Sequence, residues 1–258
     1  MKTALITGAT SGIGLELAKI HAQNGGNLVL VSRNLQKLTE IKTELEQQFG
    51  VSVFVLAADL EKENSAQEIF NELKINNIKI DFLLNNAGLG DFGNFIERGI
   101  EKCRQMIALN ISALMELTYI FANEMVRNGG GKILNVASIA SVQPVPNMAV
   151  YGATKAFVLS FSQALGYELR KTGVSVTALM PGPTSTNFFA HADGINSRMT
   201  DMNMPADKVA AIGYLTMLKG RRSVIAGLGN RVMCFFSRVI PVCNFSLKIA
   251  SRITEMKK

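Results

Sequence analysis

The sequence predicts an α/β protein in which seven parallel strands form one doubly wound sheet with helices on both faces. Short runs of valine, leucine and isoleucine alternate along the chain with longer segments of helical character. Because a helix must return the chain before each new parallel strand, this alternation is typical of a parallel sheet covered on both sides. The length of 258 residues suits a single domain of this class with a sizeable core.

The first strand, at 2–7, leads into a glycine-rich turn with the spacing G-x-x-x-G-x-G at Gly8, Gly12 and Gly14. A helix follows. Glycines in such a turn let the backbone approach a pyrophosphate, and the helix N-terminus offers unpaired N–H groups. We interpret the turn as a phosphate-binding loop. Glycines that merely turn a tight corner are the alternative.

The second strand, at 27–32, ends in Ser32 and Arg33. A site for NAD usually has an acidic residue here for the ribose 2′-hydroxyl, whereas an arginine can pair with a 2′-phosphate. The sequence therefore favours NADP(H). A solvated Arg33 at the start of the next helix is the alternative, which leaves the missing acid unexplained.

The remaining elements continue the alternation. We expect helices at 35–49, 61–76, 94–125 (two stretches), 150–170 and 206–219, and strands at 51–57, 80–84, 132–136, 174–180 and 223–226. Ligands of such sheets bind at the carboxyl ends of the strands. The glycine turn, Asp59 and the segment Asn85-Asn86-Ala87-Gly88 all fall at that edge.

Tyr151 and Lys155 stand four residues apart at the start of the helix at 150–170. Residues at this spacing share one helix face, so the ammonium can lie beneath the phenol. A nearby cation favours phenolate, so we expect the tyrosine pKa, near 10 when free, to be drawn down towards working pH. The pair predicts a general acid/base, although an exposed amphipathic pair has the same spacing.

Two further features bear on the site. Asn110 is a poor helix former within a helical stretch, which suggests a kink or a functional position. The segment from Thr184 to Pro205 is irregular but apolar, and a segment of this kind at a strand's carboxyl end is typical of a lid over substrate. Its apolar residues are Phe188, Phe189, Met199, Met202 and Met204.

From Thr3 to about Gly227 the chain resembles the short-chain dehydrogenase/reductase family, which has a Rossmann fold. The resemblance rests on Thr7-Gly8-x-x-x-Gly12-Ile13-Gly14, Asn85-Asn86-Ala87-Gly88, Pro181-Gly182 and a complete tetrad of Asn110, Ser138, Tyr151 and Lys155. It implies a homodimer or homotetramer that binds NADP(H). The implied cofactor residues are Gly8, Ser11, Gly12, Ile13, Gly14, Ser32, Arg33, Asp59, Leu60, Asn86, Ala87, Gly88, Tyr151, Lys155, Pro181, Gly182 and Thr184.

In this family's chemistry, Ser138 and Tyr151 would hydrogen-bond a carbonyl oxygen, and Tyr151 would deliver a proton as hydride arrives from the nicotinamide. Lys155 would also hold the nicotinamide ribose, and Asn110 would position a water that links Lys155 to solvent. The segment after Ser138 is mostly apolar, with Ile139, Ala140, Val142, Pro144, Val145 and Met148.

We therefore expect reduction of a small apolar ketone, aldehyde or acyl substrate. Arg198 could serve a charged substrate if the lid folds inwards. An NADP-dependent alcohol dehydrogenase and a non-catalytic NADP(H)-binding regulatory protein remain alternatives.

Composition excludes several other classes of protein. The hydrophobic share of 48% and the charged share of 18% exclude a disordered chain. Three cysteines without a C-x-x-C motif and two isolated histidines form neither a disulfide framework nor a metal site. The chain shows no secretory signal at its start. We expect a cytoplasmic protein without a metal.

The C-terminal extension at 230–258 differs from the catalytic domain expected at 1–229. It has six basic residues against the single acid Glu255, so it holds +5 of the net charge of +7. The nearly neutral body argues against a nucleic-acid-binding face. No uncharged apolar run of the extension reaches the ~18 residues of a membrane span. It can lie on the inner face of an anionic membrane, or its apolar face can pack on the body or a second subunit. We favour the second interpretation.

Overall fold

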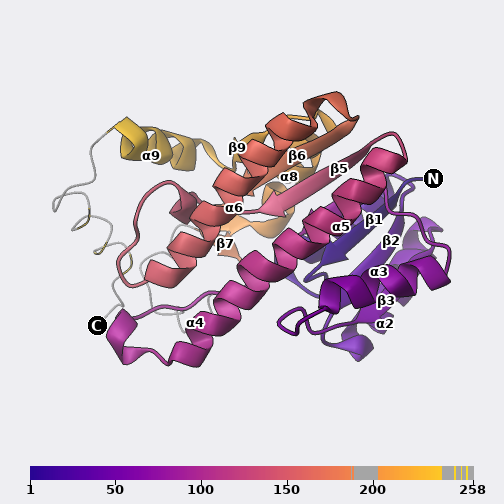
Figure 1. Cartoon of the computed structure of the whole chain (residues 1–258), viewed down its shortest axis with the longest axis horizontal. Coiled ribbons are helices and arrows are strands. Elements are labelled where there is room, and N and C mark those ends of the chain that lie inside the picture. Colours follow the sequence, from indigo (N-terminus) through magenta and orange to yellow (C-terminus); the bar gives the residue numbers. More distant parts are fainter. Residues whose placement is uncertain (187, 189–202, 240–246, 248–250, 252–253, 255–258) are drawn as a thin grey trace.

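The computed structural model describes residues 1–186, 188, 203–239, 247, 251 and 254. It confirms the seven-stranded sheet, in which all neighbouring strands are parallel and follow the order β3-β2-β1-β4-β5-β6-β9 (Figure 1). The strands are β1 (Thr3–Thr7), β2 (Asn27–Ser32), β3 (Val53–Ala57), β4 (Phe82–Asn85), β5 (Gly131–Val136), β6 (Val174–Met180) and β9 (Ser223–Ile225).

The strand order reverses at the neighbours β1 and β4. From β1 the chain first builds outwards through β2 and β3, then crosses to β4 and builds the other half of the sheet. Helices that follow β1 and β4 therefore leave towards opposite faces, and a crevice opens at the carboxyl ends of these strands. The glycine turn after β1 and the Asn86 segment after β4 border this crevice.

Helices cover both faces of the sheet. They are α1 (Gly12–Gln23), α2 (Leu35–Phe49), α3 (Ser65–Ile75), α4 (Ile100–Ile107), α5 (Leu114–Arg127), α6 (Ala149–Glu168), α8 (Ala206–Leu218) and α9 (Leu228–Val239). Single turns of tighter helix lie at Phe95–Glu97, Ile139–Ser141 and Leu169–Lys171. The bounds of α2, β2 and β6 match the predicted ranges.

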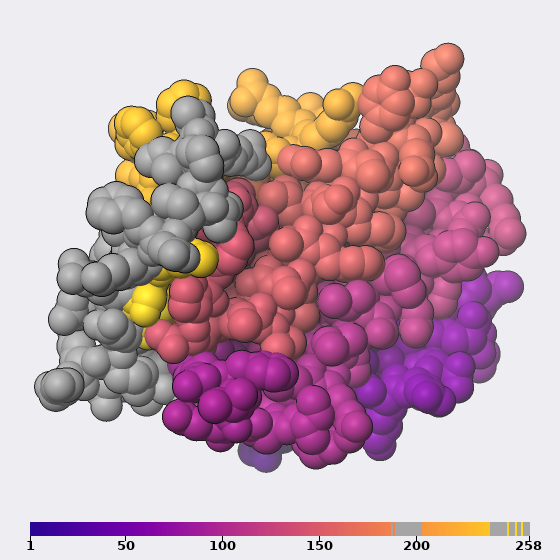
Figure 2. Space-filling model, turned by 60° about the vertical axis from the view of Figure 1, so that its left-hand side comes forward, coloured from indigo at the N-terminus to yellow at the C-terminus, as the bar shows by residue number. Residues whose placement is uncertain are grey.

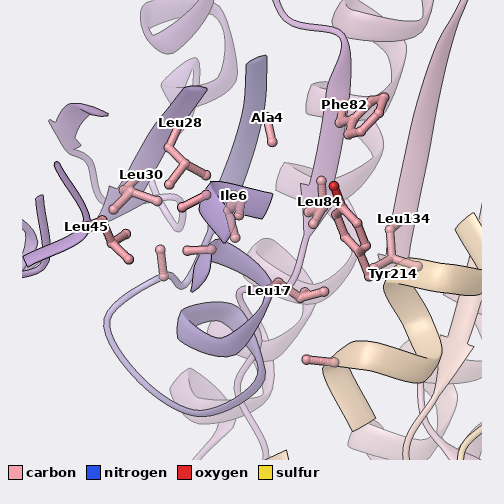
Figure 3. Packing of buried hydrophobic residues seen from close by; sticks show 14 of the residues in the cluster. Ala4, Ile6, Leu17, Leu28, Leu30, Leu45, Phe82, Leu84, Leu134 and Tyr214 are labelled. Carbon is pink, nitrogen blue, oxygen red and sulfur yellow. The ribbon is translucent and has the colours of Figure 1, made fainter. Parts of the chain in front are cut away.

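The core forms on the two faces of the sheet. In β1, Ile6 points towards α1, α2 and α8, whereas its neighbour Leu5 points towards α3 and α5. Figure 3 shows the first cluster, in which Leu17 of α1 and Tyr214 of α8 pack beneath the central strands. This alternation follows from the two-residue period of a strand whose both faces are buried.

The helical run Ile100–Arg127 is long and apolar enough to cross a membrane by length and composition alone. However, Leu117, Phe121 and Met125 on α5 are buried in the second cluster against the sheet. This burial is that of a core helix in the folded domain.

The irregular segment expected after Thr184 is bracketed by a second, two-stranded sheet. It pairs β7 (Thr184–Ser185) with β8 (Met204–Pro205), and the Met204 N–H donates to the Pro183 carbonyl at 2.9 Å. The predicted lid residues Phe189, Met199 and Met202, and Arg198, lie outside the described residues.

Candidate active site

The turn after β1 is shaped by glycines that no other residue can replace without a clash. Gly8 and Gly12 have φ of 65° and 54°, in the left-handed region that favours glycine. A Cβ on Gly8 would lie 2.9 Å from Asn86 Nδ2, and one on Gly14 would lie 2.3 Å from the Gly8 carbonyl oxygen. The turn therefore needs these glycines to bring the backbone and the N-terminus of α1 to the crevice.

Thr7 and Asn86 join this turn to the end of β4. The N–H groups of Asn86 and Ala87 both donate to Thr7 Oγ1 at 3.0 Å. Asn86 Nδ2 donates to the carbonyls of Thr7 and Gly8 at 3.0 and 3.1 Å. The two sides of the crevice are thus held by four hydrogen bonds.

The end of β2 forms the outer rim of the crevice. The Arg33 side chain is 71% exposed, and its Nη1 donates to Glu61 Oε1 at 3.4 Å. Ser32 Oγ lies 3.4 Å from Thr10 Oγ1. Because the contact is long and its arginine end is exposed, this ion pair is weak, and the guanidinium remains available to a stronger anion such as a phosphate.

Tyr151 and Lys155 lie on one face of α6, as their spacing predicts, but both are buried, at 8% and 4% exposure. Lys155 Nζ donates to the Val136 carbonyl at 2.8 Å and lies 5.9 Å from the centre of the Tyr151 ring. Ser138, two residues after the end of β5, forms a side-chain hydrogen bond with Tyr151. The alternative of an exposed amphipathic pair is therefore wrong.

The expected lowering of the Tyr151 pKa is not found. Burial raises the pKa of the phenol to about 12, and the hydrogen bond with Ser138 only partly opposes this rise. Burial also lowers the pKa of Lys155 to about 8. Both shifts have the same cause, because desolvation penalises whichever form of a group carries charge. At neutral pH the arrangement presents a protonated phenol.

Asn110 lies in a π-helical turn, Ala108–Ala113, between α4 and α5, which confirms the expected distortion. Its Oδ1 accepts from the Leu89 N–H at 2.8 Å, and its Nδ2 donates to the Leu89 carbonyl at 2.8 Å and to Thr154 Oγ1 at 3.0 Å. A Cβ on Gly88 would lie 3.4 Å from both Asn110 Oδ1 and Lys155 Nζ. The π-helical turn thus places the Asn110 amide and the Lys155 ammonium against the same residue, Gly88.

One cavity of about 370 Å³ connects the glycine turn, the β2 rim and the tetrad. Every predicted site residue lines it except two. Gly14 packs against the Gly8 carbonyl, and Asn110 is fully buried behind Gly88. Near Tyr151 the wall is apolar, and the Phe188 ring centre lies 5.4 Å from that of Tyr151. This contact agrees with a lid over substrate.

Several lining residues were not predicted. Thr10 and Glu61 lie at the β2 rim, and Met233, Cys234, Ser237 and Thr254 come from the C-terminal extension. Thr254 Oγ1 donates to the Pro146 carbonyl at 2.9 Å, which fixes this part of the extension beside the site. The amphipathic pattern of the extension was a signal that it packs on the body, but gave no target for that packing.

The cavity fits a dinucleotide. Its glycine cradle offers backbone N–H groups at a helix N-terminus for phosphates, and it extends from the Asp59 rim to Tyr151. Within the described ranges, no group of three or more His, Cys, Asp or Glu residues could hold a metal ion.

Known proteins share this sequence pattern and this fold. The family profile described as short chain dehydrogenase matches residues 2–194. Sulfoacetaldehyde reductase 2 of Chromohalobacter salexigens is 37% identical over 186 residues, which cover 71% of this chain and 73% of that protein.

Two solved structures are similar over almost the whole chain. A short-chain dehydrogenase from Sphingobium yanoikuyae in complex with NADPH superposes with a TM-score of 0.83 at 33% identity, covering 92% of each chain. A bulky-bulky ketone specific alcohol dehydrogenase from Comamonas testosteroni has a TM-score of 0.78 at 28% identity, covering 95% of this chain and 96% of that one.

Proposed function

This chain belongs to the short-chain dehydrogenase/reductase family of oxidoreductases, and we propose that it uses NADPH to reduce an apolar carbonyl substrate to an alcohol. The observation that carries this proposal is the buried phenol of Tyr151. It bonds to Ser138, lies on the same helix face as Lys155 and borders an apolar cavity beside a dinucleotide-shaped crevice.

The preference for NADPH is supported by the β2 rim. Arg33 lines the cavity at the end of β2 in place of an acidic residue, and its ion pair with the Glu61 carboxylate at the same rim is long, at 3.4 Å, with the arginine side chain 71% exposed. The glycine turn would hold the pyrophosphate, and Pro181, Gly182 and Thr184 would flank the nicotinamide. The similar Sphingobium protein binds NADPH.

The side chains of this site can do the proton chemistry of carbonyl reduction. NADPH, when bound, supplies the hydride. The hydroxyls of Ser138 and Tyr151 would donate hydrogen bonds to the carbonyl oxygen and stabilise the negative charge that develops on it. Tyr151 would then transfer its proton to this oxygen. The ammonium of Lys155, 5.9 Å from the ring centre, would stabilise the phenolate that remains.

At neutral pH, Tyr151 is in the protonation state from which carbonyl reduction starts. Reduction needs a phenol that gives up a proton, whereas oxidation of an alcohol needs a phenolate that accepts one. Burial raises the pKa of Tyr151 to about 12, which keeps the phenol protonated at neutral pH. The non-catalytic alternative is less well supported, because burying the Lys155 ammonium costs stability that its hydrogen bond to the Val136 carbonyl only partly offsets.

An apolar substrate is supported by the walls beside Tyr151. Ile139, Val145, Met148, Phe188 and Met233 line this part of the cavity, and among the described lining residues the cations are Arg33 and Lys155. The similar Comamonas protein is specific for bulky ketones, whereas the Chromohalobacter relative reduces a sulfoacetaldehyde. A hydrophobic wall fits the former better than the latter.

The test is a screen of the purified full chain for NADPH oxidation with ketones and aldehydes graded from bulky and apolar to small and anionic. We expect turnover with apolar carbonyls and little with sulfonated or carboxylated ones. Preference for anionic aldehydes would contradict the substrate class. Turnover of no compound in either direction would favour the non-catalytic alternative.

A further inference from the structure

The helix α9 has two different faces, and its inner face packs against the active site. Met233, Cys234 and Ser237 line the cavity, and Cys234 is only 1% exposed. The Asn230 side chain donates to the Ala226 carbonyl at 2.7 Å. It also fills the space beside Gly182, because a Cβ on Gly182 would lie 2.3 Å from Asn230 Nδ2. These contacts, spaced at i, i+3, i+4 and i+7, hold the helix in place.

The outer face of α9 exposes a stripe of large apolar side chains. Leu228, Val232, Phe235 and Phe236 follow one another at the spacing i, i+4, i+7 and i+8, and their exposed fractions are 76%, 50%, 63% and 55%. Atoms of α9 reach the molecular surface (Figure 2), and the helix stands at the edge of the fold, next to the edge strand β9 (Figure 1). An apolar stripe on an otherwise anchored helix is typical of an interaction surface.

Charge indicates the kind of partner that this stripe fits. Arg231 is exposed on α9, and the sequence of this helix, from Leu228 to Val239, contains two arginines and no aspartate or glutamate. A symmetric contact between two copies would bring two such basic segments together, and like charges repel. An anionic phospholipid surface offers phosphates to the arginine and an apolar layer to the phenylalanines.

We propose that the outer face of α9 docks this protein on an anionic phospholipid bilayer. The helix then lies in the interface plane, with Phe235 and Phe236 in the boundary between headgroups and acyl chains. Because the inner face of the same helix lines the cavity, docking places the active site about one helix diameter, ~10 Å, from the lipid. An apolar substrate would be concentrated in that lipid. This last consequence rests on the proposed function, whereas the docking does not.

The test is co-sedimentation of the full chain with vesicles of phosphatidylcholine alone or of phosphatidylcholine mixed with phosphatidylglycerol. We expect binding to the mixed vesicles and little binding to the neutral ones, with a loss of binding in high salt. The variant Phe235→Gln/Phe236→Gln should bind the mixed vesicles at least about tenfold more weakly. Arg231→Gln should weaken binding about fivefold, and Arg231→Lys should retain it.

The matched control is Met115→Gln/Tyr119→Gln, which removes two exposed apolar side chains at helical spacing on α5. We expect this variant to bind as the wild type does. Circular dichroism and size-exclusion chromatography of each variant in solution show that the fold is intact.

Absence of vesicle binding, or equal weakening by the control variant, would overturn the proposal. If size-exclusion chromatography instead shows a dimer that the Phe235→Gln/Phe236→Gln variant dissociates, with no binding to lipid, a second copy covers α9 and the proposal is wrong. None of these measurements depends on turnover. Failure of the docking and failure of the proposed reaction are therefore distinguishable.

Discussion

Among the single residues of the site, Tyr151 is the one whose hydroxyl proton the reaction needs. Replacing it with phenylalanine keeps the ring beside Phe188 and removes only the donor. We expect Tyr151→Phe to lower kcat for carbonyl reduction by about two to four orders of magnitude and to leave NADPH binding nearly unchanged. Steady-state kinetics and fluorescence titration of NADPH measure the two effects. Tyr167→Phe, at a half-exposed tyrosine, is the control. Retained turnover in Tyr151→Phe would remove the assignment.

Lys155 gives the site a pH dependence of its own. Burial lowers the pKa of its ammonium to about 8, so the charged form is present below that pH and is lost above it. We expect the rate of reduction to fall as pH rises through about 8, because the phenolate left on Tyr151 loses its stabilising cation. In Lys155→Arg, which stays charged, the residual activity should show no such decline. A wild-type rate that stays level up to about pH 9.5 would contradict this role.

Arg33 is a residue whose effect should separate the two cofactors. Among the described residues, its guanidinium has a long ion pair with Glu61 to give up, so a 2′-phosphate can replace that partner. We expect Arg33→Ala to raise KM for NADPH by about tenfold or more while changing KM for NADH little. Lys37→Ala, which removes an exposed cation on the neighbouring helix, is the control. An equal loss with both cofactors would show that Arg33 does not contact the 2′-phosphate.

At the scale of elements, a chain of buried amides connects the sheet to the helix that carries Tyr151. Asn85 of β4 donates to Asn135 of β5 at 2.9 Å and to Thr118 of α5 at 3.0 Å, and Asn135 donates to Ser162 of α6 at 2.9 Å. These bonds fix α5 and α6 at defined positions over the strands. The placement of Tyr151 over the crevice thus depends on polar contacts inside the core.

Removing Asn135, the middle residue of this series of buried hydrogen bonds, should lower the stability of the fold. Asn135→Ala removes one of the two hydrogen-bond partners of buried Asn85 Nδ2 and of buried Ser162 Oγ, so we expect the free energy of unfolding to fall by about 1 to 3 kcal/mol. Urea denaturation measures the change. Asn123→Ala removes an exposed asparagine bonded to Tyr119 and should change the free energy by less than about 0.5 kcal/mol. Similar losses in both variants would show that the buried side-chain hydrogen bonds contribute no more to the free energy of unfolding than an exposed one.

The sequence predicted those elements whose pattern is local. The bounds of α2, β2 and β6 follow from apolar periodicity, and the distortion at Asn110 follows from its poor helix propensity. The pairing of β7 with β8 was not foreseen, because two-residue strands have no period of their own. The pKa of Tyr151 was wrongly predicted because helix spacing shows which residues are close but not how deeply the surrounding chain buries them.

At the scale of the whole molecule, the phosphate-binding turn is braced by a contact that spans most of the sequence. His21 of α1 lies between the Tyr214 hydroxyl of α8, 2.8 Å from its Nδ1, and the Lys2 carbonyl, 3.1 Å from its Nε2. Because a carbonyl can only accept, Nε2 carries the proton of the neutral ring, and Nδ1 accepts from the tyrosine hydroxyl. Lys2 directly precedes β1, and α1 begins at the glycine turn. The buried imidazole therefore links three segments that position the cofactor crevice.

This contact should make the fold sensitive to acid. Burial lowers the pKa of His21, so the unfolded chain binds a proton at a higher pH than the folded one does. Stability from the neutral ring is fully present above the unfolded pKa of about 6.5 and is lost as pH falls through the lower folded value. We expect the free energy of unfolding in urea to fall more steeply below about pH 6.5 in the wild type than in His21→Gln. Glutamine can make both hydrogen bonds but does not titrate, and parallel declines in the two proteins would assign acid sensitivity to other groups.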